Sequence, residues 1–147
     1  MPPTPPTSPP TTIILHVFRG GDVMNDSKAT RHASLFIRYP GSHMGTLIHA
    51  TNSQGPWRVE MRVDYNPATS INIVGSALVC HLPIHPDAVL RVLQQVPIKN
   101  ELEWNCQHWV GDALQAMVIH QLITLELRSV ALDQMVDILI QRPADAI

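Results

Sequence analysis

The chain has 147 residues, a formal net charge of -2 and a pI of about 6.4, so it is long enough for one domain with a hydrophobic core. The near-neutral charge and the lack of a Lys/Arg cluster argue against a nucleic-acid-binding protein. Two cysteines are too few for a disulfide-built secreted fold, and no leader peptide or membrane-length apolar run is recognisable. We therefore expect a cytoplasmic protein in a reduced compartment, without a membrane anchor.

The chain begins with a segment rich in Pro, Thr and Ser. Residues 1–12 carry almost no apolar side chain to bury, which predicts a disordered tail. The remaining residues, 13–147, are expected to form a single α+β domain.

Five stretches have the β-branched and alternating composition of strands, and turn residues separate them. The predicted strands are 12–19, 31–39, 46–50, 57–65 and 71–82, with a loop from residue 20 to about residue 30. Short turns between the middle strands predict an antiparallel meander.

Three helical patterns follow the strands, at 87–96, 105–120 and 129–140, the last one after a serine cap. Strands first and helices afterwards are typical of an α+β fold, here an antiparallel sheet packed on one face by about three helices. The apolar face of the last helix also offers a surface for forming a homodimer.

A cysteine at the start of the second predicted helix is the main chemical signal. Asn105 is a good N-cap, which places Cys106 in the first turn, where the helix dipole favours a thiolate. Helical spacing directs Cys106 inward with Val110 and projects His108 to nearly the opposite side. A general base is therefore expected from another part of the chain.

Two histidines on strands are the candidates for that role. His32 lies at the start of the second predicted strand, and His49 lies in the third. With Cys106 they fit a cysteine–histidine–polar triad, in which the third residue orients the base. Each histidine taken alone is more commonly a hydrogen-bonded core residue.

Three segments resemble the lecithin:retinol acyltransferase-like proteins, a circularly permuted branch of the NlpC/P60 papain-like superfamily. They are residues 32–37 (HASLFI), 47–50 (LIHA) and 105–110 (NCQHWV). The resemblance implies that Cys106 is the nucleophile, His32 the base and His49 the orienting residue. Gln107 replaces an acidic residue of the family motif, and Ala33 replaces an aromatic one. The third segment is also similar to uncharacterised small fungal proteins, some of them associated with biosynthetic enzymes.

These features favour an enzyme, a small cysteine-dependent acyltransferase or hydrolase. It would act on an amide, ester or thioester of a small molecule, with secondary-metabolite biosynthesis as a setting. Two alternatives use the same residues differently. One is a non-covalent isomerase or cyclase with His and Cys as acid and base, and the other is a catalytically silent binding module.

Four further residues are candidates for substrate binding because they flank the proposed triad or its loops: Asn105, Trp104, Trp109 and His43. For the two tryptophans, packing is the commoner role. Cys80, His81 and His85 have too few ligands for zinc, and no cofactor motif occurs, so we expect neither a metal nor a cofactor. The charged residues of the strands are interpreted as solvated sheet faces; they are Arg31, Arg38, Arg58, Arg62, Glu60 and Asp64.

Overall fold

The computed structural model describes residues 9–20, 30–53, 55–99 and 101–141. Its sheet contains β1 (Thr11–Phe18), β2 (His32–Arg38), β3 (Gly45–Thr51), β4 (Arg58–Tyr65) and β5 (Ile73–Leu82). The strands lie in the order β4-β3-β2-β1-β5 and every pair is antiparallel. The first four strands form the predicted meander, and β5 returns to pair with β1 at the opposite edge.

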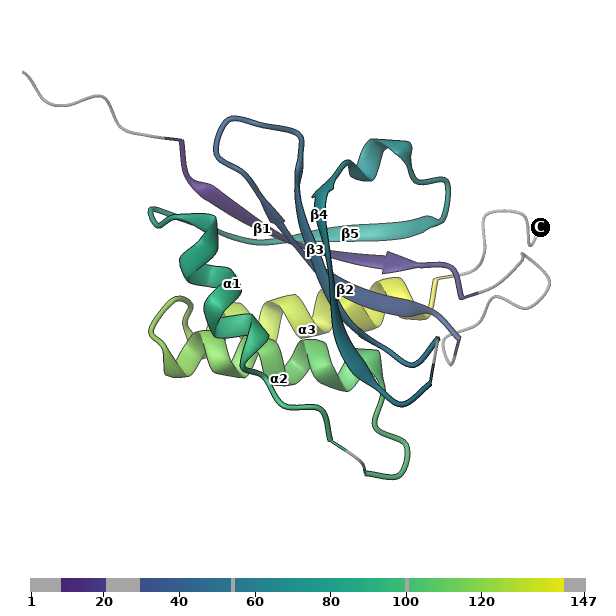
Figure 1. Cartoon of the computed structure of the whole chain (residues 1–147). Coiled ribbons are helices and arrows are strands. Elements are labelled where there is room, and N and C mark those ends of the chain that lie inside the picture. The colour runs from purple at the N-terminus through teal and green to yellow at the C-terminus, as the bar shows by residue number, and fades with distance from the viewer. Residues whose placement is uncertain (1–8, 21–29, 54, 100, 142–147) are drawn as a thin grey trace, which may run out of the picture.

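Three helices follow the sheet, α1 (Pro86–Gln94), α2 (Cys106–Ile119) and α3 (Leu125–Leu139). A short 3-10 helix, η2 (Pro67–Thr69), lies in the connection between β4 and β5. Figure 1 shows the three helices together on one side of the twisted sheet. The predicted α+β class, an antiparallel sheet packed against about three helices, is confirmed.

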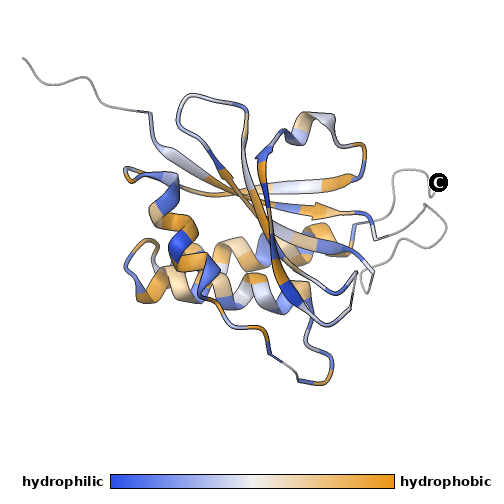
Figure 2. Ribbon diagram, in the orientation of Figure 1, coloured by the Kyte–Doolittle hydropathy of each residue, from blue (hydrophilic) through white to orange (hydrophobic). Residues whose placement is uncertain are grey.

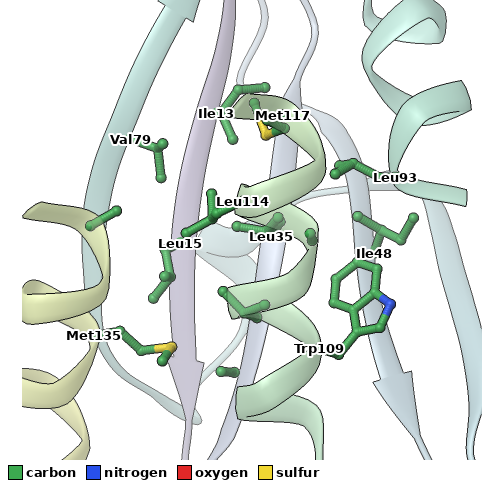
Figure 3. Close-up of a cluster of buried hydrophobic side chains, with 14 of the residues drawn as sticks. Ile13, Leu15, Leu35, Ile48, Val79, Leu93, Trp109, Leu114, Met117 and Met135 are labelled. Carbon is green, nitrogen blue, oxygen red and sulfur yellow. The ribbon is translucent and has the colours of Figure 1, made fainter. Parts of the chain in front are cut away.

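The core lies between the sheet and the helices because alternate strand residues point toward α1, α2 and α3. The central strands appear apolar in Figure 2, while the helices carry both apolar and polar positions. Figure 3 shows how the two layers meet: Leu15 and Leu35 of neighbouring strands face Leu114, and Trp109 lies beside Ile48. All five of these side chains are fully buried. Among the described helices, none is long and apolar enough to cross a membrane.

Two predicted boundaries differ from the structure. Thr11, predicted in the tail, and Thr12, predicted both in the tail and in the first strand, belong to β1, are buried and pair with β5. The third helix starts at Leu125 rather than near Ser129, since the Thr124 side chain already accepts a hydrogen bond from the N–H of Leu127 and caps it. Residues 1–8 of the predicted tail and residues 21–29 of the predicted loop lie outside the described residues.

Arg31 corrects the interpretation of the strand charges as solvated. It precedes β2, is 2% exposed, and donates from its guanidinium to the carbonyls of Ile138 (2.7 Å) and Leu139 (3.2 Å). These carbonyls belong to the last turn of α3, where backbone acceptors have no partner within the helix. Arg31 therefore fixes the start of β2 to the end of α3.

Candidate active site

The N-terminus of α2 holds Cys106 in a defined position. Asn105 caps the helix, accepting at Oδ1 from the N–H groups of Gln107 (2.9 Å) and His108 (3.4 Å). The backbone N–H of Asn105 donates in turn to Nδ1 of His108 (3.2 Å), which completes a capping box. His108 is therefore engaged in the helix cap, and Cys106 is the first residue of the helix.

Cys106 is buried, with 6% of the residue exposed. Burial raises the pKa of this thiol, while hydrogen bonds from the backbone N–H groups of Ala33, Gln107 and Cys106 itself act in the opposite direction. The net pKa is raised, so the thiol is protonated at neutral pH. Because one of the three donors is Ala33, the sulfur lies beside the first residues of β2.

The sheet leaves room for the sulfur at this point. Pairing between β2 and β3 runs from Arg38 opposite Gly45 to Leu35 opposite Ile48. Within the described residues, the first three residues of β2, 32–34, pair with β1 alone. The edge of Ala33 that faces β3 is therefore not paired with that strand, and the N-terminus of α2 can reach the Ala33 backbone there.

His32 and His49 meet directly. Nε2 of His32 and Nδ1 of His49 form a hydrogen bond, and the two rings stand edge to face with centroids 4.4 Å apart. No hydrogen bond joins the Cys106 sulfur to either ring among the described residues, although the sulfur contacts the residue that follows His32. The structure thus brings the two histidines together and places the Cys106 sulfur against the backbone of Ala33, the residue that follows His32 in sequence.

Glu60 extends the histidine pair. It lies opposite His49 in the β3–β4 ladder, and its Oε1 accepts from His49 Nε2 at 3.1 Å. Arg58 donates to Oε2 (3.0 Å) and Arg62 donates to Oε1 (3.1 Å). Burial alone raises the pKa of Glu60, but hydrogen bonds from Arg62, His49 and Arg58 outweigh it and bring the pKa to about 2. Glu60 is therefore a carboxylate at neutral pH.

Both histidines are neutral at neutral pH. Burial, followed by the nearby His49 and Arg62, lowers the pKa of His32 to about 4 against the opposing charge of Glu60. Burial also lowers the pKa of His49, although the hydrogen bond and charge of Glu60 partly compensate. A neutral imidazole has one nitrogen that donates and one that accepts. Each ring can therefore donate a hydrogen bond to one neighbour and accept one from another.

A cavity of about 220 Å³ lies on the sheet face opposite the helices, against the histidine pair. Its lining includes both histidine rings, the side chains of Arg19 and Arg62, and residues of the connection that leads from β4 to β5. Cys106 is not among the residues that line it. The histidine pair therefore lies between the cysteine region and an open, polar pocket.

The predicted substrate-binding residues have different locations. Asn105 is the helix cap, and Trp104 packs its ring against Trp57 (centroids 5.7 Å apart) while its indole N–H donates to Asp112 at 3.4 Å. Trp109 is fully buried in the core and presents no surface to a ligand. His43 lies in the β2–β3 turn and lines a different cavity, of about 450 Å³.

Glu60 and Gln107 are site residues that the sequence did not identify. Glu60 alternates with Arg58 and Arg62, a pattern that a solvated strand face also produces. The Gln107 side chain donates to the carbonyl of Arg31 (3.2 Å) and links α2 to β2. The one available signal for Glu60 was an acidic residue between two arginines on the same strand face.

Cys80 and Cys106 are both free thiols. Within the described part of the chain, no group of three or more His, Cys, Asp or Glu side chains is arranged to hold a metal ion.

Comparison with protein families places most of the chain in a known family. The model of a family of unknown function (DUF6540) matches residues 19–124, a range that includes both histidines, Glu60 and Cys106. No curated protein matches the chain, and no solved structure matches it either.

Proposed function

The chain belongs to the family of unknown function DUF6540, and we propose from the geometry of its site that it is a cysteine-dependent acyltransferase or hydrolase. Cys106 is the nucleophile, His32 the general base, and His49 with Glu60 orients that base. The substrate is an amide, ester or thioester of a small molecule. The observation that carries the proposal is the hydrogen-bonded chain from Glu60 through His49 to His32, which ends next to the strand residue that contacts the sulfur.

This chain of hydrogen bonds fixes the tautomers of both rings. A carboxylate only accepts, so His49 carries its proton on Nε2 and accepts at Nδ1. His32 must then donate from Nε2 to His49, which leaves Nδ1 of His32 as a lone-pair acceptor. No described residue hydrogen-bonds to this Nδ1, so it is the nitrogen free to take a proton from the thiol.

A neutral thiol and a neutral imidazole define the first step. Nδ1 of His32 removes the thiol proton as the Cys106 sulfur forms a bond to the acyl carbon, and the carbonyl π electrons move to oxygen. The backbone N–H groups of Cys106, Gln107 and Ala33 lie around the sulfur, and we assign to them the stabilisation of that oxyanion. The intermediate then expels the leaving group, which receives the proton from His32.

The second step regenerates the enzyme. Water, or an acceptor nucleophile, loses a proton to Nδ1 of His32 and attacks the thioester carbon, and the carbon–sulfur bond breaks to return the thiol. Hydrolysis and acyl transfer differ only in this nucleophile. The two free cysteines support a reduced, cytoplasmic site of action.

One observation favours a second candidate. Burial raises the pKa of Cys106, and a protonated thiol is suited to act as a general acid rather than as a nucleophile. With His32 as the base, the same residues would serve a non-covalent isomerase or cyclase.

Trapping of the acyl intermediate tests the proposal. The protein is mixed with a small activated ester, p-nitrophenyl acetate, and intact mass and peptide mapping locate the acetyl group. We expect acetylation of Cys106, loss of the adduct in Cys106→Ala, and strong slowing in His32→Ala. Cys80→Ser is the matched control and retains the adduct.

Two results would contradict the covalent mechanism. An acetyl group found on Cys80 instead, or p-nitrophenol release that persists unchanged in Cys106→Ala, removes the nucleophile assignment. Release that survives Cys106→Ala and disappears in His32→Ala supports acid–base chemistry without a covalent intermediate.

A further inference from the structure

The cavity beside the histidine pair has an unusual charge balance. Arg19 and Arg62 both line it, and none of the described residues that line it is acidic. Glu60 faces Arg62 from the neighbouring position on β4 but does not line the cavity. The cavity wall is therefore cationic.

Within the described part of the chain, no carboxylate pairs with Arg19. Its Nη2 donates to the side-chain oxygen of Asn72 (3.0 Å), and its backbone N–H donates to the Asn72 carbonyl (2.7 Å). Its Nε is buried and has no hydrogen-bond partner, and no ion pair involves this guanidinium among the described residues. A buried donor without an acceptor is costly, so an oxyanion at this place would be stabilised.

Arg62 lies close enough to act on the base. Its charge is one of the causes that lower the pKa of His32, and it lies opposite Leu47 on the same sheet face as His49. The rest of the rim supplies neutral hydrogen-bonding groups from the β4–β5 connection, including Ser70 and Asn72. Two guanidinium groups and neutral donors thus surround one side of His32.

The cavity is also small. Its volume of about 220 Å³ is below the 300 to 1,000 Å³ of sites that enclose a whole drug-sized ligand. It fits one polar substituent of a substrate whose acyl group reaches past His32.

We infer that this cavity is a subsite for a carboxylate, so that the acyl substrate of the proposed enzyme carries a carboxylate separated from its reacting carbonyl by about the width of the His32 ring. The inference rests on the proposed function, because it concerns the substrate of Cys106. Arg19 and Arg62 bind the carboxylate and orient the acyl carbon toward the sulfur.

Iodoacetate and iodoacetamide form a matched pair of probes, since they differ in one negative charge. Each alkylates a thiol by forming a carbon–sulfur bond and releasing iodide, with the thiol proton passing to a base. Peptide mapping of the full chain follows both cysteines in one sample, and Cys80 is the internal reference. We expect the iodoacetate-to-iodoacetamide rate ratio at Cys106 to exceed that at Cys80 by about tenfold, and to fall as salt screens the arginines.

Arg58 offers a control, because it also binds Glu60 but does not line the cavity. We expect Arg62→Gln and Arg19→Gln to remove most of the iodoacetate preference at Cys106, and Arg58→Gln to retain it. Equal rate ratios at Cys106 and Cys80 in the wild type would overturn the subsite while leaving the nucleophile intact. An equal loss of the iodoacetate preference in Arg58→Gln would also overturn the subsite. The preference would then come from the overall positive charge of the arginines near Glu60 and not from binding in the cavity.

The two proposals fail in different ways. If Cys106 reacts with neither reagent under conditions that alkylate Cys80, the proposed function fails, and the subsite fails with it. If Cys106 reacts with both reagents and shows no preference for the anion, only the subsite fails.

Discussion

The side-chain amide of Gln107 donates a hydrogen bond to the backbone carbonyl of Arg31 across 3.2 Å. Gln107 directly follows Cys106 in sequence, and Arg31 directly precedes His32. This bond therefore joins the two segments that carry the proposed nucleophile and base. It is a direct side-chain link between the first turn of α2 and the start of β2, where the sulfur contacts Ala33.

Replacing Gln107 by Leu is expected to misplace the sulfur relative to His32. We predict about a tenfold loss in the rate of Cys106 acetylation, because small displacements of reacting groups are costly. Stability should fall by about 1 kcal/mol for the lost hydrogen bond. Acetylation kinetics and urea unfolding check both values. Gln115→Leu, on the same helix, is the control, and an unchanged rate in Gln107→Leu would limit this bond to a structural role.

Glu60 is predicted to set the tautomer of the base. Without the Glu60 carboxylate, the proton of His49 is no longer held on Nε2. The tautomer of His32 is then no longer fixed, and its Nδ1 is not always free to accept a proton. Glu60→Ala should slow Cys106 acetylation by about 10- to 100-fold, within the range of general acid–base effects. Nitrogen-15 NMR of the two rings reports the tautomers directly. Asp64→Asn on the same strand is the control, and an unchanged His32 tautomer in Glu60→Ala would refute the assignment.

The fold could be predicted because each strand and helix has its own local pattern. Asn105 illustrates this: a capping residue followed by an apolar helical repeat correctly indicated the start of α2. The contact between His32 and His49 was also expected from their positions on neighbouring strands. Their catalytic roles stay predictions.

What the sequence could not provide is the outcome of tertiary pairing. Glu60 is opposite His49 only because of the β3–β4 register, and its neighbours Arg58 and Arg62 made it look like part of a solvated face. Arg31 is buried because the last turn of α3, more than 100 residues away, brings its carbonyls to that point. Trp109 fills the core rather than a cleft because it lies on the face of α2 that packs on the sheet.

The pH profile of acetylation is predicted to have an unusually low midpoint. Burial, with His49 and Arg62, lowers the pKa of His32 to about 4, so the ring can accept a proton above that pH. The rate should rise through about pH 4 and stay level across neutrality, because the raised pKa of Cys106 delays any thiolate contribution. Acetylation rates measured alongside circular dichroism test this, and a midpoint near 6.5 would mean an unperturbed base.

Stability should also decline in acid because His16 is buried as a neutral ring. Burial lowers the pKa of His16 to about 4, whereas the unfolded chain titrates near 6.5. The unfolded state therefore binds the proton first, and the free energy of unfolding falls as the pH drops from 6.5 toward 4. His16 accounts for about 3 kcal/mol of this loss. Below pH 6.5, the free energy of unfolding of His16→Phe, measured in urea, should depend on pH less than that of the wild type. Above pH 6.5, the two proteins should show the same pH dependence. Equal pH dependence of the two proteins below pH 6.5 would contradict the prediction.

His108 is predicted to affect stability and not chemistry. Its Nδ1 accepts from the backbone N–H of Asn105, so the imidazole serves the capping box of α2. His108→Ala should cost about 1 kcal/mol of unfolding free energy, as for other helix caps, and change the acetylation rate of Cys106 by less than about twofold. His32→Ala should show the opposite pattern, a large loss of rate at a temperature where the variant remains folded. His108 is the histidine nearest to Cys106 in sequence. Comparing the two variants therefore decides whether His108 or His32 is the general base. A large rate loss in His108→Ala without a stability loss would transfer that role to His108 and remove it from His32.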